Sequence, residues 1–349
     1  MGKKRIYIYA LFLVVLAVLV YLQFRTWKNF DWPTFWSQGK QISRRHILQA
    51  IALIYFHYFL RALRWKIFLR PVRKDVSTTS LISPTMIGFT GMALLGRPGE
   101  LIRPYLIARR TNLTFSSQMA AWAVERVFDI CAFTVLLVLA IFLPGTALHS
   151  LQSRGVTIFG LLFIALAVGV SLGAVLVAKS GEAVSSWLER RFSHVSAHLA
   201  HRIARRLREF HGGLDTIHDP LAFFEIVGVS LAMWSCIALA YLEVTHAYGT
   251  ALRQMTISTI MPLMGSSMLG SLIQLPGIGG GSQLGTISAL QYIYRVPHEL
   301  AASCGILLWL TTFVSVVPAG LLLAHRERLS LRKLSEESEQ EEARAELPS

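Results

Sequence analysis

The chain has 349 residues, of which 53% are hydrophobic and only 15% charged, and its mean hydropathy is +0.50. Soluble domains carry about 25% charged residues, so this composition excludes an ordinary soluble protein and indicates a polytopic membrane protein. The formal charge is +14, and a basic excess in a membrane protein indicates cytoplasmic loops and anionic lipid rather than nucleic acid.

Six apolar runs are long enough to cross a bilayer, which requires about 20 helical residues. They are residues 6–24, 47–69, 118–143, 156–178, 221–247 and 300–323. Lys3, Lys4 and Arg5 precede the first run, which is too long for a signal-peptide core and has no small-residue cleavage site after it. We therefore expect this run to remain as a membrane anchor.

Two shorter apolar stretches, 79–95 and 257–275, are each followed by a Gly/Pro break and a second short helix. Basic residues crowd the loops on the cytoplasmic side of a membrane. Such residues gather at 70–74, 109–110, 179–208 and 326–333, whereas 144–155 and 248–256 hold one arginine each. The loops before and after each short pair are therefore expected on the same side of the membrane. Each pair then enters and leaves on that side, the first from the cytoplasm and the second from outside.

The expected fold is thus all-α: a polytopic membrane helix bundle of about six full spans plus two re-entrant helical hairpins that enter from opposite faces. The N- and C-termini are expected in the cytoplasm. One segment runs against this scheme, because the 25–46 loop, which it places outside, carries five basic residues. Residues 326–349 are strongly charged, and we interpret them as a disordered cytoplasmic tail.

The second span contains His57, Arg61 and Arg64 on one helical face. Arg64 lies near the expected cytoplasmic end, where its side chain can extend to the membrane surface. We interpret Arg61 as a candidate binding residue for an anionic group. The alternative is that Arg61 only fixes helix packing.

The first break reads Gly96-Arg97-Pro98-Gly99-Glu100, and Arg103 follows. Irregular backbone at membrane depth is tolerated where it lines a cavity or is covered by protein, so the break predicts a lined cavity. If Pro98 opens a helix, the three charged residues share one face. We predict that Arg97 and Arg103 bind an anionic group, that Glu100 orients them, and that Gly99 permits close approach. The alternative is that the arginines merely neutralise Glu100 or extend toward inner-leaflet phosphates.

The third span contains Glu125, Arg126 and Asp129, in which Arg126 can meet Asp129 three residues later. Each ionisable group near the bilayer midplane costs about 3 kcal/mol on insertion scales, so three of them imply partners or a wet cavity. We predict an intramembrane charge network here. Its role can be packing or function, and the sequence leaves both open.

Apolar residues recur every three or four positions between 181 and 212, with arginines between them. This pattern predicts an amphipathic cytoplasmic helix between the two halves, ended by Gly212 and Gly213. His194, His198 and His201 share a face of it, but no carboxylate or cysteine accompanies them. We therefore expect no metal site, and we identify no catalytic residue and no cofactor motif.

The second break carries four glycines within five positions. Backbone amides at Gly277, Gly279, Gly280 and Gly281 can converge on an anion, and the positive end of a helix that starts near Ser282 would face the same point. The break does not match a P-loop or a dinucleotide fingerprint. The alternative is a plain re-entrant turn whose glycines serve close packing.

Four motifs together resemble the lysylphosphatidylglycerol synthase transmembrane-region family, also called flippase-like. They are Gly96-Arg97-x-Gly99-Glu100-x-x-Arg103, Arg109-Arg110, Glu125-Arg126-x-x-Asp129 and the Pro-Gly-rich break at 276–281. The resemblance covers nearly all of residues 1–325, which we interpret as one transmembrane domain. Gln283 departs from the Glu often found after the second break. No soluble aminoacyl-transfer domain follows, so we do not expect this chain alone to make an aminoacylated lipid.

The resemblance implies a translocator in the bacterial inner membrane that moves an anionic phospholipid or lipid-linked head group between leaflets, rather than an enzyme. A second hypothesis is an integral-membrane transferase acting on a lipid. Against it, the sequence has no H-E-x-x-H, G-x-S-x-G or paired Asp motif. A third hypothesis is a non-transporting partner of a separate synthase or glycosyltransferase.

Overall fold

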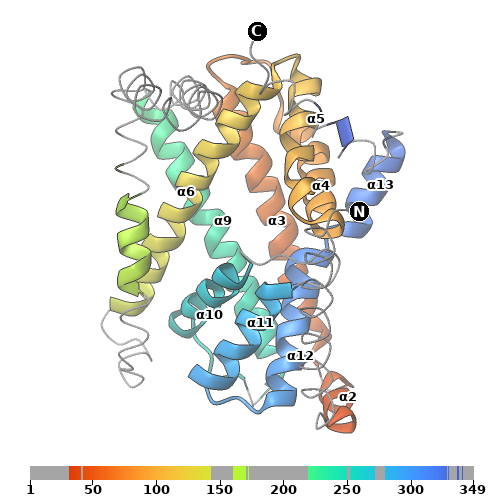
Figure 1. Cartoon of the computed structure of the whole chain (residues 1–349), viewed down its shortest axis with the longest axis vertical. Coiled ribbons are helices and arrows are strands. Elements are labelled where there is room, and N and C mark those ends of the chain that lie inside the picture. Colours follow the sequence, from red (N-terminus) through yellow and green to blue (C-terminus); the bar gives the residue numbers. More distant parts are fainter. Residues whose placement is uncertain are drawn as a thin grey trace, which may run out of the picture.

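The computed structural model describes residues 31–40, 42–142, 160–169, 219–249, 252–271 and 280–327, with isolated positions at 172, 329, 336, 337 and 340. Helices make up all regular structure in these ranges (Figure 1). The predicted first span at 6–24, the amphipathic helix at 181–212 and most of the tail lie outside the described residues. So do Gly277 and Gly279 of the second break.

Long helices form the body of the molecule. They are α3 (Arg44–Leu69), α6 (Phe115–Phe142), α9 (Pro220–His246) and the continuous series α12 (His298–Trp309), η6 (Leu310–Val314) and α13 (Val317–Arg326). At 1.5 Å per residue, the 26 residues of α3 extend roughly 39 Å, enough to cross a bilayer core of about 30 Å. Four stretches, 44–69, 78–95, 220–246 and 298–326, are long and apolar enough to cross a membrane. The predicted all-α membrane helix bundle is confirmed.

Shorter helices complete the described part. α2 (Trp32–Lys40) precedes α3, and an apolar helix at Gly160–Gly169 lies within the predicted fourth span. The remaining short helices belong to two hairpins: α4 (Thr78–Leu95), η1 (Arg97–Leu101) and α5 (Ile102–Thr111) in the first, and α10 (Ile257–Gly270), α11 (Gly280–Ser288) and η5 (Ala289–Ile293) in the second.

In the first hairpin, α5 returns along α4. Near the end of α5, Arg110 Nη1 donates a hydrogen bond of 2.6 Å to the carbonyl oxygen of Ser80 at the start of α4. At the tip, a Cβ atom built on Gly99 would lie 2.2 Å from the carbonyl carbon of Gly91. The two arms therefore meet at both ends, and the chain enters and leaves at one end of the bundle.

The second hairpin is closed in the same manner. Tyr294, directly after η5, donates its hydroxyl to the carbonyl oxygen of Thr259 near the start of α10, at 2.7 Å. Near the tip, a Cβ atom on Gly270 would lie 2.0 Å from the carbonyl oxygen of Gly281. A glycine pair thus brings the two arms together in each hairpin.

The antiparallel pair α3 and α9 fixes the ends at which the hairpins start. Ser43, before α3, donates its amide to the carbonyl oxygen of Ala247, after α9, at 3.0 Å. At the other end Arg70 pairs with Glu225 at 2.8 Å. The first hairpin follows the end of α3 and the second follows the end of α9, so they enter the bundle from opposite ends (Figure 1).

We expect single cysteines at positions 75 and 253 to be labelled from opposite sides of the membrane. Asp75 lies in the exposed loop before the first hairpin and Arg253 in the exposed loop before the second. A membrane-impermeant maleimide, applied to intact cells and then to opened membranes, measures the side of each. The native cysteines 131, 236 and 304 are replaced by Ser as background. Labelling of both positions from the same side would contradict the opposed hairpins.

Gly99→Ala is expected to lower the free energy of unfolding by about 1–3 kcal/mol, the usual cost of overpacking. The reason is that the added methyl group would overlap the backbone of Gly91. Gly228→Ala on α9 is the matched control, because a Cβ atom there meets nothing within 4 Å. Thermal unfolding in detergent measures both variants, and equal melting curves would mean that the hairpin tip is not packed this closely.

Candidate functional site: a cationic cavity between the hairpins

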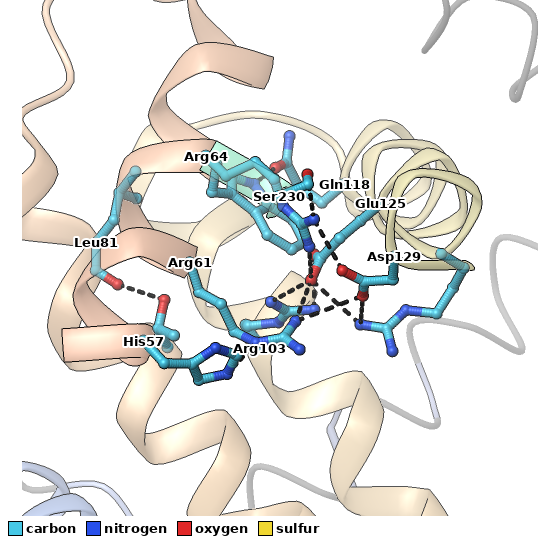
Figure 2. A network of polar contacts seen from close by, with 12 residues as sticks. His57, Arg61, Arg64, Leu81, Arg103, Gln118, Glu125, Asp129 and Ser230 are labelled. Carbon is cyan, nitrogen blue, oxygen red and sulfur yellow. Dashed lines mark hydrogen bonds and ion pairs between the residues drawn. The ribbon is translucent and has the colours of Figure 1, made fainter. Parts of the chain in front are cut away.

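Three arginines from two other helices converge on Glu125 in the middle of α6 (Figure 2). The carboxylate of Glu125 lies 2.6 Å from Arg61 Nη1, 2.7 Å from Arg64 Nη2 and 2.8 Å from Arg103 Nη2. All four side chains are buried. The charge of Glu125 is therefore compensated inside the protein, as a carboxylate at membrane depth requires.

Asp129, one turn further along α6, shares two of these partners, Arg61 and Arg64. Its carboxylate lies 2.8 Å from Arg64 Nη1 and 3.7 Å from Arg61 Nη1. Arg126 Nη2 reaches Asp129 at 3.4 Å, which is the predicted contact over three residues. Trp234 of α9 donates its indole N–H to the same carboxylate at 3.3 Å. The predicted charge network is present, and it joins α3, α5, α6 and α9.

Local packing explains how the arginines reach α6. Arg61 and Arg64 are three residues apart on α3, so they share a face, and Arg61 Nε lies 2.8 Å from His57 Nε2 on that face. Arg103 is the second residue of α5, which lies close to α4 because a Cβ atom on Gly88 would come within 2.4 Å of Arg103 Cβ. The expectation that Arg64 extends to the membrane surface is wrong, since it is 1% exposed and paired.

Aromatic rings hold two of the guanidinium groups. Arg103 stacks over the Trp65 ring, with 4.5 Å between its Cζ and the ring centroid, and Arg61 lies 4.8 Å over Phe89. A cation over a ring face is attracted by the negative face of the ring, and this contact takes up no hydrogen-bond donor. The aromatic contacts thus help to hold the two guanidinium groups while their donors remain available to other groups.

The network has more positive than negative charge. Arg61, Arg64, Arg103 and Arg126 contribute four positive charges, and Glu125 and Asp129 contribute two negative charges, so the cluster carries a net charge of +2. Arg126 is 42% exposed, so the buried members alone carry an excess of one positive charge. Burying charge without compensation is unfavourable, which makes the cluster receptive to an anion.

A cavity of about 340 Å³ lies beside this network. Arg61, Arg103 and Arg126 line it together with His57, Asp129 and Glu100. Both hairpins contribute to its wall, the first through residues such as Phe89 and the second through residues such as Ser267. The arginines thus border a cavity whose wall is formed by residues of both hairpins.

Several predicted residues of the first break have a different role or position from the one expected. Glu100 lines the cavity, but among the described contacts Arg103 pairs with Glu125 and not with Glu100. Gly99 is buried against Gly91, so its missing side chain serves the contact between α4 and η1. The side chain of Arg97 lies outside what the structure describes.

In the second break, α11 begins at Gly280, two residues before the expected start. Gly281 packs against Gly270, and Ser282 lines the cavity. The positive end of α11 therefore lies next to the cavity. Within the described ranges no group of three or more His, Cys, Asp or Glu side chains is arranged to hold a metal ion. The histidines at 194, 198 and 201 lie outside those ranges.

Sequence reasoning did not select Arg64, Trp65, Ser230 and Trp234. Arg64 Nη1 donates to Ser230 Oγ at 2.8 Å as well as to Asp129. The sequence did contain one indication that further cations such as Arg64 take part: two acids on α6 need more positive charge than the nearby Arg126 provides. Which helix supplies those cations depends on packing that sequence spacing does not encode.

No solved structure matches this chain. A UPF0104 membrane protein of Methanothermobacter thermautotrophicus is 23% identical over 262 residues, which cover 71% of this chain and 74% of that protein. Glycosyltransferase AglD of Haloferax volcanii is 27% identical over 226 residues, which are 58% of this chain but only 36% of that protein. Residues 8–320 match the family model of the lysylphosphatidylglycerol synthase TM region, and the chain therefore belongs to that family of membrane proteins.

Proposed function

We propose that this protein moves an anionic phospholipid or a lipid-linked head group between the two leaflets of the membrane without changing it chemically. The observation that carries the proposal is the cavity that Arg61, Arg103 and Arg126 line, with both opposed hairpins in its wall. A lipid phosphate is the abundant anion at a membrane surface, and guanidinium groups bind phosphate through paired N–H donors.

The opposed hairpins suggest how a head group is passed on. Interrupted helices from opposite sides that meet at a central site are typical of transporters, in which one half rocks against the other around the site. Here α4, η1 and α5 form one wall of the cavity, and α10 and α11 form another. Each hairpin is in a position to open the cavity toward its own end of the bundle.

The charge network also argues against Glu125 and Asp129 as the general base of a transferase. A general base needs an available carboxylate or imidazole. Glu125 and Asp129 are each held by several arginines, which stabilises their ionised form and makes them poor proton acceptors. We accordingly propose that any enzymatic step on the lipid belongs to a separate synthase or glycosyltransferase. The partial match to a protein named glycosyltransferase AglD supports a sugar-bearing head group as a second class of cargo.

We place the protein in the inner, or plasma, membrane with both termini in the cytoplasm, on the basis of the loop charges.

Reconstitution of the purified chain in liposomes tests the function. Vesicles containing a head-group-labelled anionic phospholipid are probed with a membrane-impermeant quencher, and mass spectrometry follows the lipid. Movement between leaflets without a change in mass supports the proposal. A changed mass favours the transferase, and immobile, unchanged lipid favours the non-transporting partner.

A further inference from the structure

One part of the cavity lining carries hydroxyl groups in place of arginines. Tyr241 of α9, Ser267 of α10, Ser271 directly after it, and Thr312 of η6 all line the cavity. None of the described residues that α10, α11 and η6 contribute to the lining is charged. A small adjoining recess is lined by Tyr241, Ser267 and Thr312 as well, and also by Gln283. We call Tyr241, Ser267, Ser271 and Thr312 the hydroxyl wall.

The hydrogen bonds of these groups determine what they offer to a ligand. Ser271 donates its hydroxyl to the carbonyl oxygen of Met268 at 2.6 Å, and Thr312 donates to Leu308 at 2.7 Å. Their oxygen lone pairs remain as acceptors. Tyr241 donates to Ser267 Oγ at 3.2 Å, which leaves the Ser267 hydroxyl hydrogen for another acceptor. The hydroxyl wall therefore presents both neutral acceptors and a donor.

This mixture of neutral donors and acceptors matches alcohol groups. Each hydroxyl of a polyol is one donor and two acceptors, so it can satisfy both kinds of partner. An ammonium group has only donors and is best compensated by a carboxylate, which the described residues of this wall lack. Both Tyr241 and Ser267 are at most 7% exposed, so their unused hydrogen-bonding capacity faces the cavity and not bulk water.

Cavity size limits the ligand further. Ligand pockets range from about 300 to 1,000 Å³, and this cavity of about 340 Å³ lies at the lower end. It has room for a phosphate and one small polyol, while acyl chains must remain outside. We propose that the hydroxyl wall is a subsite for a hydroxylated head group, glycerol or a single sugar ring, joined to the phosphate that Arg61 and Arg103 bind. This inference rests on the proposed function and specifies its cargo.

Two lipids with the same charge test the subsite. Short-chain phosphatidylglycerol and phosphatidylmethanol both carry one phosphodiester, and only the first carries hydroxyl groups. We expect the full chain, purified in detergent, to bind phosphatidylglycerol about tenfold more tightly, the effect of one or two neutral hydrogen bonds. Short-chain phosphatidylinositol separates the two sources of hydroxyls: a preference for either polyol lipid over phosphatidylmethanol supports the inference and identifies whether glycerol or a ring fits.

Ser267→Ala is expected to bring the ratio of the two dissociation constants close to one. The matched control is Ser266→Ala, the same change at the neighbouring residue, whose hydroxyl donates to the carbonyl oxygen of Pro262 at 3.1 Å and which does not line the cavity. This control should keep the ratio of wild type. Thr312→Val retains the side-chain shape and provides a second test if Ser267→Ala fails to fold.

The outcomes separate this inference from the proposed function. Equal binding of phosphatidylglycerol, phosphatidylinositol and phosphatidylmethanol by wild type overturns the hydroxyl subsite but leaves phosphate binding intact. An unchanged ratio in folded Ser267→Ala or Thr312→Val protein also overturns the subsite. Binding of none of the three lipids overturns both proposals.

Discussion

Glu125→Gln should lower the free energy of unfolding by about 3–5 kcal/mol, the range measured when one partner of a buried ion pair is removed. Glutamine has nearly the same shape but no charge, so Arg61, Arg64 and Arg103 would lose their shared counterion. Asp129 alone would then compensate three buried arginines, and the buried part of the cluster would carry a net charge of +2. Thermal unfolding in detergent and the yield of monodisperse protein measure the effect.

Glu225→Gln provides the matched control for that experiment. It is the same chemical change in a pair with Arg70, whose side chains are 34% and 41% exposed. Pairs of this kind contribute about 0–1 kcal/mol because water screens them and solvates either partner alone. If Glu125→Gln and Glu225→Gln shift the melting temperature equally, Glu125 is solvated and the buried network does not stabilise the fold.

The network also changes what is expected of Arg126. From the sequence, Arg126 is the nearest cation to both acids, so its removal would appear severe. In the structure its side chain is 42% exposed, and Glu125 retains three other arginines without it. Arg126→Leu should therefore be far milder than Glu125→Gln, because the remaining cluster still compensates both carboxylates.

The helices of the bundle were predictable because the bilayer imposes their length. The run at 47–69 became α3 (Arg44–Leu69), and the run at 221–247 became α9 (Pro220–His246). The breaks were predictable for a related reason: Gly and Pro interrupt an apolar run only where the chain turns or is covered by protein. The glycine contacts of Gly99 and Gly270 are the packing that those breaks permit.

The partners of the charged residues were less predictable. Spacing along a helix suggested that Glu100 pairs with Arg103, but a 3-10 turn, η1, ends at Leu101, between the two. Residues three apart stay on one side of a 3-10 helix as well, and both side chains line the cavity, yet among the described contacts the ion pair of Arg103 is with Glu125. Arg103 instead reaches Glu125, 22 residues away, because Gly88 allows α5 to approach α4. Such pairings depend on helix contacts that only the assembled fold determines.

Arg103→Lys is expected to reduce lipid movement by about tenfold or more while the protein still folds. Arg103 Nη1 donates a hydrogen bond of 3.1 Å to Glu125 Oε1, and its Nη2 lies 2.8 Å from Glu125 Oε2 as an ion-pair contact, which leaves the rest of its five donors for a phosphate in the cavity. Lysine keeps the positive charge near Glu125 but cannot hold a carboxylate and a phosphate in one planar arrangement. Losing one charge-assisted hydrogen bond, worth about 1.5–3 kcal/mol, corresponds to a loss of this size.

Arg109→Lys controls for the substitution itself, because Arg109 lies on the exposed side of α5 and does not line the cavity. It should transport like wild type in the same liposome assay. Arg61→Lys is expected to behave like Arg103→Lys, since both guanidinium groups bind Glu125 Oε1 and border the cavity. Transport is normalised to folded protein recovered in the vesicles. Wild-type rates for both Arg61→Lys and Arg103→Lys, or losses that merely follow the amount of folded protein, would mean that charge alone is needed and that these guanidinium groups do not recognise the head group.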